Sequence, residues 1–140
     1  MGLRMGAIVV DCHDPGPVAR FWAAALDWVI SRETDPEWTV EPRAGTRDDC
    51  VVADLLFIKV PEDKQVKNRL HFDLRPEDQA AEVSRLEALG ATRVDVGQGD
   101  QPWVVLADPE GNEFCVQPAH SPEIRAAWLQ AYESHQPVRA

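Results

Sequence analysis

The feature that most constrains this 140-residue chain is an internal repeat. Each half has the order strand, helix, strand, strand, strand, and the two copies are offset by roughly 63 residues. Their ends also correspond, because Phe57-Ile58-Lys59-Val60-Pro61 matches Phe114-Cys115-Val116-Gln117-Pro118. A unit of this kind leaves one face of its sheet without cover. Two tandem βαβββ modules therefore predict an α+β fold, in which a cupped mixed sheet has its helices outside.

Apolar spacing and turn residues predict the elements of the first half. A dense apolar run predicts a strand at 3–11. Asp14 followed by Pro15 is a typical helix start, because the carboxylate caps the helix and proline has no N–H to leave unpaired. The helix that follows has one apolar stripe, made by Val18, Phe21, Trp22, Ala25 and Leu26. Further strands are expected at 28–33, 38–42 and 51–60.

In the second half, alternation predicts a strand at 68–74 that places His71, Asp73 and Arg75 on one face. A helix is expected to open at Pro76 and to end at Gly90, a typical left-handed cap. Strands are expected near 92–96, at 103–108 and at 113–118. Residues 108–112, with the sequence DPEGN, predict a tight turn, near which Glu110 and Glu113 are expected to be solvated.

A last helix is expected after Ser121, which caps it, with Pro122 in the first position. Its apolar stripe is expected to pack against the domain or a second subunit, and consists of Ile124, Ala127, Trp128, Ala131 and Tyr132. Both Trp22 and Trp128 are therefore expected in the core. The predicted organisation is one domain at 1–120, with modules at about 1–64 and 65–120, then a helix and tail at 121–140, of which 135–140 fray.

The net charge and the cysteines indicate which partner molecules and which cell compartment to expect. Acidic residues outnumber basic ones 24 to 14, so the net charge is −10 and phosphate backbones and anionic membranes are repelled. The chain starts with no signal-like segment, and no apolar run approaches the roughly 20 residues of a membrane-spanning helix. The three cysteines form no CxxC pair, which is typical of reduced thiols. We expect a cytoplasmic protein with no nucleic-acid or membrane partner.

Several short motifs lie in matching order along residues 3–118. They are Asp11 and Asp14 before the first helix, Phe21-Trp22 and Leu26 within it, the segment Lys67–Asp73, Leu89-Gly90-Ala91, and Asp108–Asn112. Together they resemble the vicinal oxygen chelate superfamily and, within it, the glyoxalase-like domains of the glyoxalase/bleomycin resistance type. The resemblance implies paired modules, a small-molecule ligand in the cup and a homodimer, but it does not fix a reaction.

In metal-using members, the resemblance implies four ligand positions, on the first and last strands of both modules. Here His71 and Cys115 occupy the two positions of the second module. The other two positions fall on Ala7 or Ile8, and on Ile58, whose side chains cannot bind a metal. Two ligands are fewer than the three of most catalytic metals. We therefore expect no cofactor, and a divalent metal held by His71 and Cys115 is the alternative.

The residues expected to line the cup are His71, Asp73, Cys115, Ile58 and Trp103. Asp73 could orient His71 or form a salt bridge with Arg69 or Arg75. Cys115 could be a small buried apolar side chain or, paired with His71, a nucleophile.

Three functions remain open. The first is metal-independent binding of a small molecule, such as the sequestration of a toxic or antibiotic compound, with a cationic aromatic ligand favoured. The second is a lyase or isomerase acting on a small oxygenated metabolite, in which His71 is the acid–base group or a metal ligand. The third is an interaction domain without a ligand, which uses the last helix as a dimer face.

Overall fold

The computed structural model describes residues 2–3 and 5–134, so the expected fraying of 135–140 lies outside them. The first module consists of β1 (Ala7–Cys12), α1 (Pro15–Leu26), β2 (Val29–Glu33), β3 (Glu37–Glu41) and β4 (Asp54–Lys59). The second consists of β5 (Asp73–Leu74), α2 (Gln79–Leu89), β6 (Thr92–Arg93), β7 (Val104–Ala107) and β8 (Glu113–Val116). With α3 (Pro122–Ser134) at the end, these elements confirm the α+β fold of tandem βαβββ modules.

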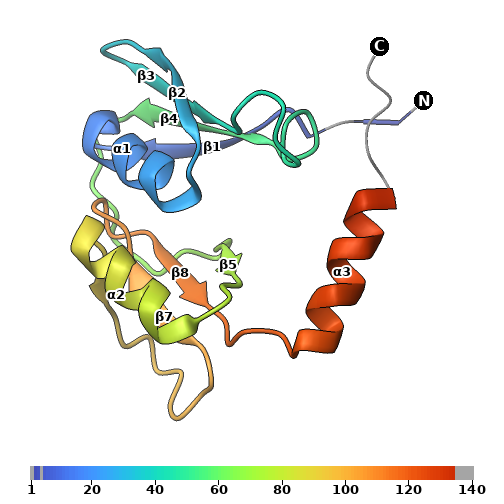
Figure 1. Cartoon of the computed structure of the whole chain (residues 1–140). Coiled ribbons are helices and arrows are strands. Elements are labelled where there is room, and N and C mark those ends of the chain that lie inside the picture. The colour runs from blue at the N-terminus through green and yellow to red at the C-terminus, as the bar shows by residue number, and fades with distance from the viewer. Residues whose placement is uncertain (1, 4, 135–140) are drawn as a thin grey trace.

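The two modules repeat the same sheet topology (Figure 1). The strand order is β1-β4-β3-β2 in the first sheet and β5-β8-β7-β6 in the second. In each module the first and last strands pair in parallel, and the other pairs are antiparallel. Each sheet is thus a separate four-stranded layer, and β1 and β5 are edge strands of their own sheets.

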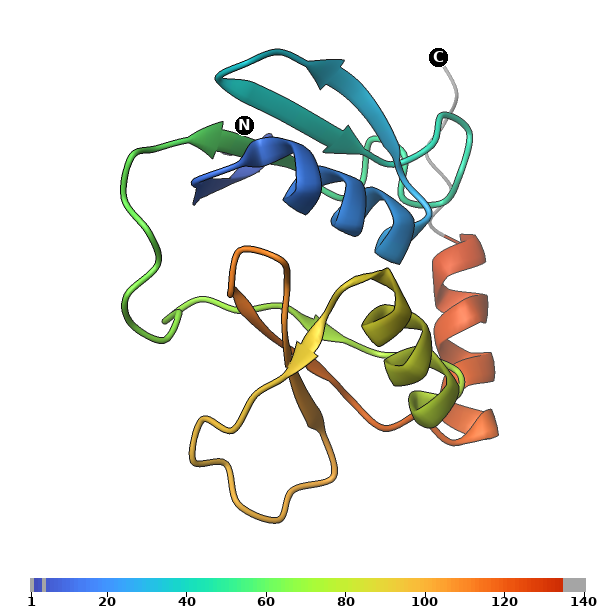
Figure 2. The same ribbon diagram turned by 90° about the vertical axis from the view of Figure 1, so that its left-hand side faces the viewer.

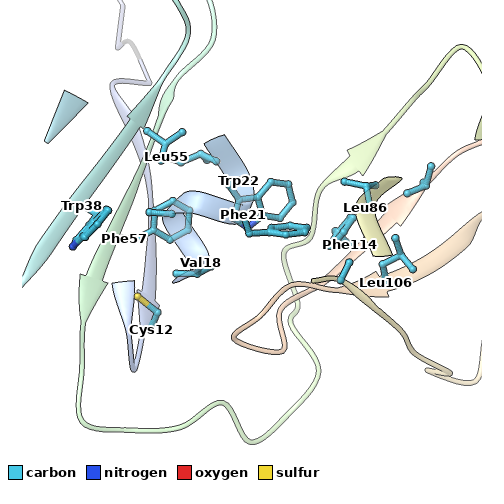
Figure 3. Close-up of a cluster of buried hydrophobic side chains, with 14 of the residues drawn as sticks. Cys12, Val18, Phe21, Trp22, Trp38, Leu55, Phe57, Leu86, Leu106 and Phe114 are labelled. Carbon is cyan, nitrogen blue, oxygen red and sulfur yellow. The ribbon is translucent and has the colours of Figure 1, made fainter. Parts of the chain in front are cut away.

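Helix α1 connects the two modules, because it lies between their sheets (Figure 2). On one side Val18 belongs to the buried cluster that includes Phe57 of the first sheet (Figure 3). On the other side the Trp22 ring packs edge-on against Phe72 and Phe114 of the second module, at 5.3 and 5.0 Å between ring centroids. Residues of the single apolar stripe predicted from the sequence therefore pack against both sheets.

Polar contacts close both ends of α1. At its start, Gly16 N donates to the Asp14 carboxylate at 3.3 Å, which confirms Asp14 as the cap. At its end, the Arg85 guanidinium of α2 donates to the carbonyls of Ala24 and Ala25, at 3.1 and 2.7 Å. Since the last carbonyls of a helix have no partner within it, these bonds satisfy the end of α1 and join it to α2.

Two predicted boundaries in the second module are wrong. The strand expected at 68–74 is reduced to Asp73–Leu74, because side chains, and not a strand ladder, hold the start of this segment. Asn68 N donates to the Glu113 carboxylate at 2.9 Å. Helix α2 begins at Gln79 and not at Pro76, because Asp78 is its cap and accepts a bond from Ala81 N at 3.0 Å. Gly90, with a φ of 115°, ends α2 as predicted.

Helix α3 starts as predicted, with Ile124 N donating to Ser121 Oγ at 3.3 Å. The prediction that Trp128 is buried is wrong, since this residue is 64% exposed. The helix forms ion pairs with the remainder of the chain, Arg125 with Glu77 and Arg47 with Glu133, and the Trp128 ring lies 5.3 Å from the His120 ring. Within the part of the chain that the structure describes, no helix has the length and apolar character needed to cross a membrane.

Candidate functional site

A cavity of about 280 Å³ lies where the edge strand β1 faces the segment 68–72. We call it the seam cavity, and its lining consists of β1 residues 8–11, Asn68, Leu70, His71, Phe72, Trp22, Asp108, Asn112 and Glu113. Most of this wall is apolar or aromatic, and carboxylates interrupt it. Ligand sites in proteins combine these two features, and their usual volumes are roughly 300–1,000 Å³. The seam cavity therefore suits a small organic molecule.

A buried acid holds Trp22 in the wall of this cavity. Asp108 is 3% exposed, and its carboxylate accepts a bond from Trp22 Nε1 at 2.9 Å. The Asn112 side chain donates to both oxygens at 3.1 Å, and the backbone N–H groups of Glu110 and Asn112 donate as well. Burial raises the pKa of Asp108 above its ordinary value, although these hydrogen bonds act in the opposite direction. Sequence reasoning recognised the turn at 108–112 but missed its role as an anchor between modules.

The prediction that Glu110 and Glu113 are solvated is wrong. The Glu110 carboxylate accepts bonds from His13 N at 2.7 Å and Asp14 N at 2.9 Å, at the entry of α1. The Glu113 carboxylate accepts bonds from Lys64 Nζ at 2.8 Å and from Asn68 N. Both carboxylates therefore fix chain segments around the seam cavity. No local signal could have identified them, because their partners lie far away in the sequence.

Glu113 makes the stability of this region sensitive to acid. Burial by itself would raise the pKa of Glu113, but the bonds from Asn68 N and Lys64 outweigh it and lower the pKa below 4.5. A carboxyl group whose pKa is lower in the folded state stabilises the fold above its unfolded pKa, and this stabilisation is lost as the pH falls through the folded pKa.

We expect Glu113→Gln to lower the free energy of unfolding by about 1 kcal/mol at pH 7, because an amide is a weaker acceptor for two donors. The loss should become smaller below about pH 4, where the native carboxyl group also takes up a proton. Urea unfolding at both pH values measures it. The control is Glu62→Gln, on an exposed residue of the same connection. An equal effect at both pH values would contradict the assignment.

Three side chains that the sequence singled out meet on one face of the β5–β8 pair. His71, Asp73 and Cys115 each offer a ligand atom, and these atoms all lie within 4.8 Å of one another. Asp73 is directly opposite Cys115 in the parallel register. His71 Nε2 lies 3.6 Å from Asp73 Oδ1, while Gln117 Nε2 donates to Asp73 Oδ2 at 2.9 Å. We call these three residues the β5–β8 cluster.

The structure distinguishes between the roles that the sequence left open for Asp73 and Cys115. Asp73 contacts His71 and Gln117, whereas the Arg75 guanidinium donates to the Pro118 carbonyl. Cys115 is buried, and burial raises the pKa of its thiol, as does the adjacent Asp73 carboxylate. A thiol with a raised pKa is a poor nucleophile at neutral pH. The burial of Cys115 therefore favours the small buried apolar side chain over the alternative of a nucleophile.

Ile58 lies in the sheet of the first module, and Trp103 lies beside the sheet of the second. Ile58 is half-buried on β4, opposite Asp11 of β1 and Glu37 of β3. Trp103 is half-buried and directly precedes β7. Neither belongs to the lining of the seam cavity, whereas His71 belongs to both the cavity and the cluster. Contact of Ile58 and Trp103 with a ligand stays a prediction.

The sequence of the chain matches a known family. The family model described as "Glyoxalase-like domain" matches residues 7–117. The chain belongs to this family. Among curated proteins, none matches the sequence of the chain.

Solved structures of glyoxalase-like proteins share the fold of this chain at low sequence identity. A glyoxalase/bleomycin resistance protein/dioxygenase family enzyme from Burkholderia phytofirmans PsJN has 14% identity and a TM-score of 0.61, over 84% of this chain and 100% of that one. TnmS3, an antibiotic-binding protein from Streptomyces sp. CB03234, has 17% identity and a TM-score of 0.56, over 84% and 97%. The Leishmania major glyoxalase I has 15% identity and a TM-score of 0.59, over 95% and 98%. The same fold thus includes an antibiotic-binding protein and an enzyme.

The metal site implied for catalytic members does not fit the residues of this chain. Of its four positions, Ile58 and either Ala7 or Ile8 carry no donor atom. In the structure these residues lie on β1 and β4, in the sheet of the first module, and His71 and Cys115 belong to the second. An ion shared between the modules would therefore have protein ligands on one side only.

Proposed function

We propose that this glyoxalase-like protein binds a small cationic organic molecule in the seam cavity and releases it unchanged. The observation that carries the proposal is the composition of the cavity wall. Apolar and aromatic side chains are combined there with the carboxylate of Asp11, and among the residues that the structure describes no lysine or arginine lines the cavity. The carboxylates of Asp108 and Glu113 also reach the lining, but they are already held by N–H donors and, for Glu113, by Lys64. Such a wall favours a ligand with an apolar body and a positive end. Sequestration of a toxic or antibiotic compound is the biological role we propose, and the fold shared with an antibiotic-binding protein supports it.

Binding in the seam cavity needs no metal, because the four-ligand site does not fit. We further propose that the protein is a cytoplasmic homodimer. The exposed apolar side chains of α3, Ile124, Trp128 and Leu129, support a dimer face on that helix.

The test compares two probes of nearly equal size and opposite charge, phenethylamine and 3-phenylpropionate, by calorimetry in the presence of a chelator. We expect the amine to bind and the carboxylate to bind at least about 10-fold more weakly, a difference of about 1.4 kcal/mol. Asp11→Asn should reduce the affinity for the amine by a similar factor. The control is Asp54→Asn, the same change in the same sheet but outside the cavity lining. Equal binding of the two probes, or no binding of the amine at millimolar concentration, would overturn the proposal.

The alternative, a lyase or isomerase, is favoured by the contact between His71 and Asp73, since a carboxylate can orient an imidazole for proton transfer. A probe for it is hydroxyacetone in D₂O, followed by nuclear magnetic resonance with a chelator present. Deuterium incorporation faster than in buffer, and lost in His71→Ala, would establish the enzyme in place of the binding protein. No acceleration would favour binding without turnover.

A further inference from the structure

We propose that a second cavity, bordered by α3, binds an aromatic carboxylate of two or more fused rings. This cavity has a volume of about 520 Å³, and we call it the α3 cavity. Its lining shares no residue with the seam cavity or with the β5–β8 cluster. The inference is therefore independent of the proposed function.

The walls of the α3 cavity come from three segments that are far apart in the sequence, because α3 lies alongside both modules (Figure 1). One segment belongs to the loop before β4, one follows β5, and the third leads into α3 and includes its first half. Ion pairs join these walls, since Arg125 of α3 pairs with Glu77, and Arg47 pairs with Glu133 of α3 at 3.1 Å. The cavity thus exists only when α3 is docked.

The lining of the α3 cavity is positive, although the net charge of the chain is −10. It contains three arginines, Arg47, Arg75 and Arg125, against the two acids Asp48 and Glu77. Two of the arginines have the glutamate partners given above.

Arg75 is the cation that remains for a ligand. Its guanidinium donates to the Pro118 carbonyl at 2.6 Å, and within the described residues no carboxylate forms an ion pair with it. A guanidinium has five N–H donors, so most of them are left after this bond. Arginine binds a carboxylate through two parallel N–H···O bonds, and a charged partner of that shape suits Arg75.

Apolar side chains of α3 complete the site. Trp128 and Leu129 line the cavity and are 64% and 41% exposed, so the protein itself covers little of their surface. The His120 ring, which also lines the cavity, lies 5.3 Å from the Trp128 ring. An aromatic ligand packed against Trp128 removes apolar surface from water. The volume is nearly twice the 280 Å³ of the seam cavity, which leaves room for more than one ring.

The test compares two probes of the same shape by calorimetry on the full-length protein, naphthalene-2-carboxylate and its uncharged amide, naphthalene-2-carboxamide. We expect about one carboxylate per chain, bound at least about 10-fold more tightly than the amide, because only the carboxylate pairs with Arg75. Equal affinities of the two probes, or no binding of the carboxylate at millimolar concentration, would overturn the proposal.

The variant Arg75→Gln keeps this test separate from the amine experiment, because Arg75 lies outside the lining of the seam cavity. Phenethylamine should bind Arg75→Gln as it binds the native chain. Its comparison with 3-phenylpropionate is made in this variant as well, since a small carboxylate also fits the α3 cavity. Failure of the amine to bind then contradicts the proposed function alone, and failure of naphthalene-2-carboxylate contradicts this inference alone.

Matched arginine variants locate the carboxylate. Arg75→Gln should weaken binding of naphthalene-2-carboxylate by about 10-fold and leave the amide unchanged, because the charge is lost and the apolar wall is kept. Arg69→Gln is the control, since Arg69 is exposed, has no ion pair within the described part of the chain, and lies outside the cavity lining. An unchanged affinity in Arg75→Gln, or an equal loss in Arg69→Gln, would contradict the site.

Matched variants of α3 locate the aromatic body. Trp128→Ala should weaken both probes by a similar factor, whereas Ile124→Ala, at an exposed position of the same helix outside the lining, should weaken neither. Ile124 also belongs to the dimer face proposed above, so sedimentation of Ile124→Ala shows whether the dimer persists. Loss of carboxylate binding together with the dimer would place the site between two copies and overturn a cavity formed within one chain.

Discussion

Replacing Trp22 by alanine is expected to lower the free energy of unfolding by about 3–5 kcal/mol. Trp22 is 2% exposed and contacts Phe72 and Phe114 of the second module, although it belongs to α1 of the first. The substitution leaves a cavity between the modules and removes the donor to Asp108. The loss should therefore exceed that of a tryptophan buried in one module only. Chemical unfolding followed by far-ultraviolet circular dichroism measures it.

Trp128→Ala is the matched control, because it makes the same change at a residue that is 64% exposed. We expect it to change the free energy of unfolding by less than about 0.5 kcal/mol in the monomer. Comparable losses in the two variants would show that α1 does not connect the modules. If Trp22→Ala instead unfolds in two steps, the two modules unfold separately. A core shared between the modules also predicts this result, because the substitution removes the contacts that join them.

Replacing Asp108 by asparagine is expected to cost about 1–3 kcal/mol, although the shape of the side chain is unchanged. The carboxylate accepts bonds from four N–H groups. They are the Trp22 indole, the Asn112 side chain, and the backbone N–H groups of Glu110 and Asn112. An asparagine must direct its own NH₂ group at one of them. The buried donor left without an acceptor then lowers stability, and the free energy of unfolding in urea shows by how much.

A double-mutant cycle separates the cost of losing the bond between Trp22 and Asp108 from the other consequences of Asp108→Asn. Trp22→Phe removes the indole N–H but keeps most of the aromatic packing. If the bond between Trp22 and Asp108 carries the cost, Asp108→Asn should be less damaging in the Trp22→Phe background, by about 1 kcal/mol. Additive losses would show that the backbone donors of the turn, and not Trp22, determine the cost.

The features that were predicted correctly depend on residues close together in the chain. Asp14 and Ser121 cap helices by bonding to N–H groups two and three residues away, and Gly90 ends α2 in a left-handed conformation. Capping and turn preferences are properties of short peptides, so the sequence displays them directly. The internal repeat extended this local information to the whole fold, because each module confirms the element order of the other.

The features that were missed depend on contacts between distant segments. Asp108 and Trp22 are 86 residues apart, and Asn68 and Glu113 are 45 residues apart. The Glu113 contact lies at the start of the segment 68–72, where its carboxylate, and not a neighbouring strand, accepts the backbone N–H of Asn68. The apolar stripe of its helix predicts that Trp128 lies in the core, but a stripe does not show which surface covers it.

The sequence by itself determined the two modules and their element order, because apolar spacing and turn residues are local properties of the chain. Only the tertiary structure decided that Asp73 lies opposite Cys115, that α1 packs between two sheets, and that three carboxylates surround the seam cavity. These depend on strand register and on how the modules approach each other. Many weak contacts set both together, and no short stretch of sequence contains them.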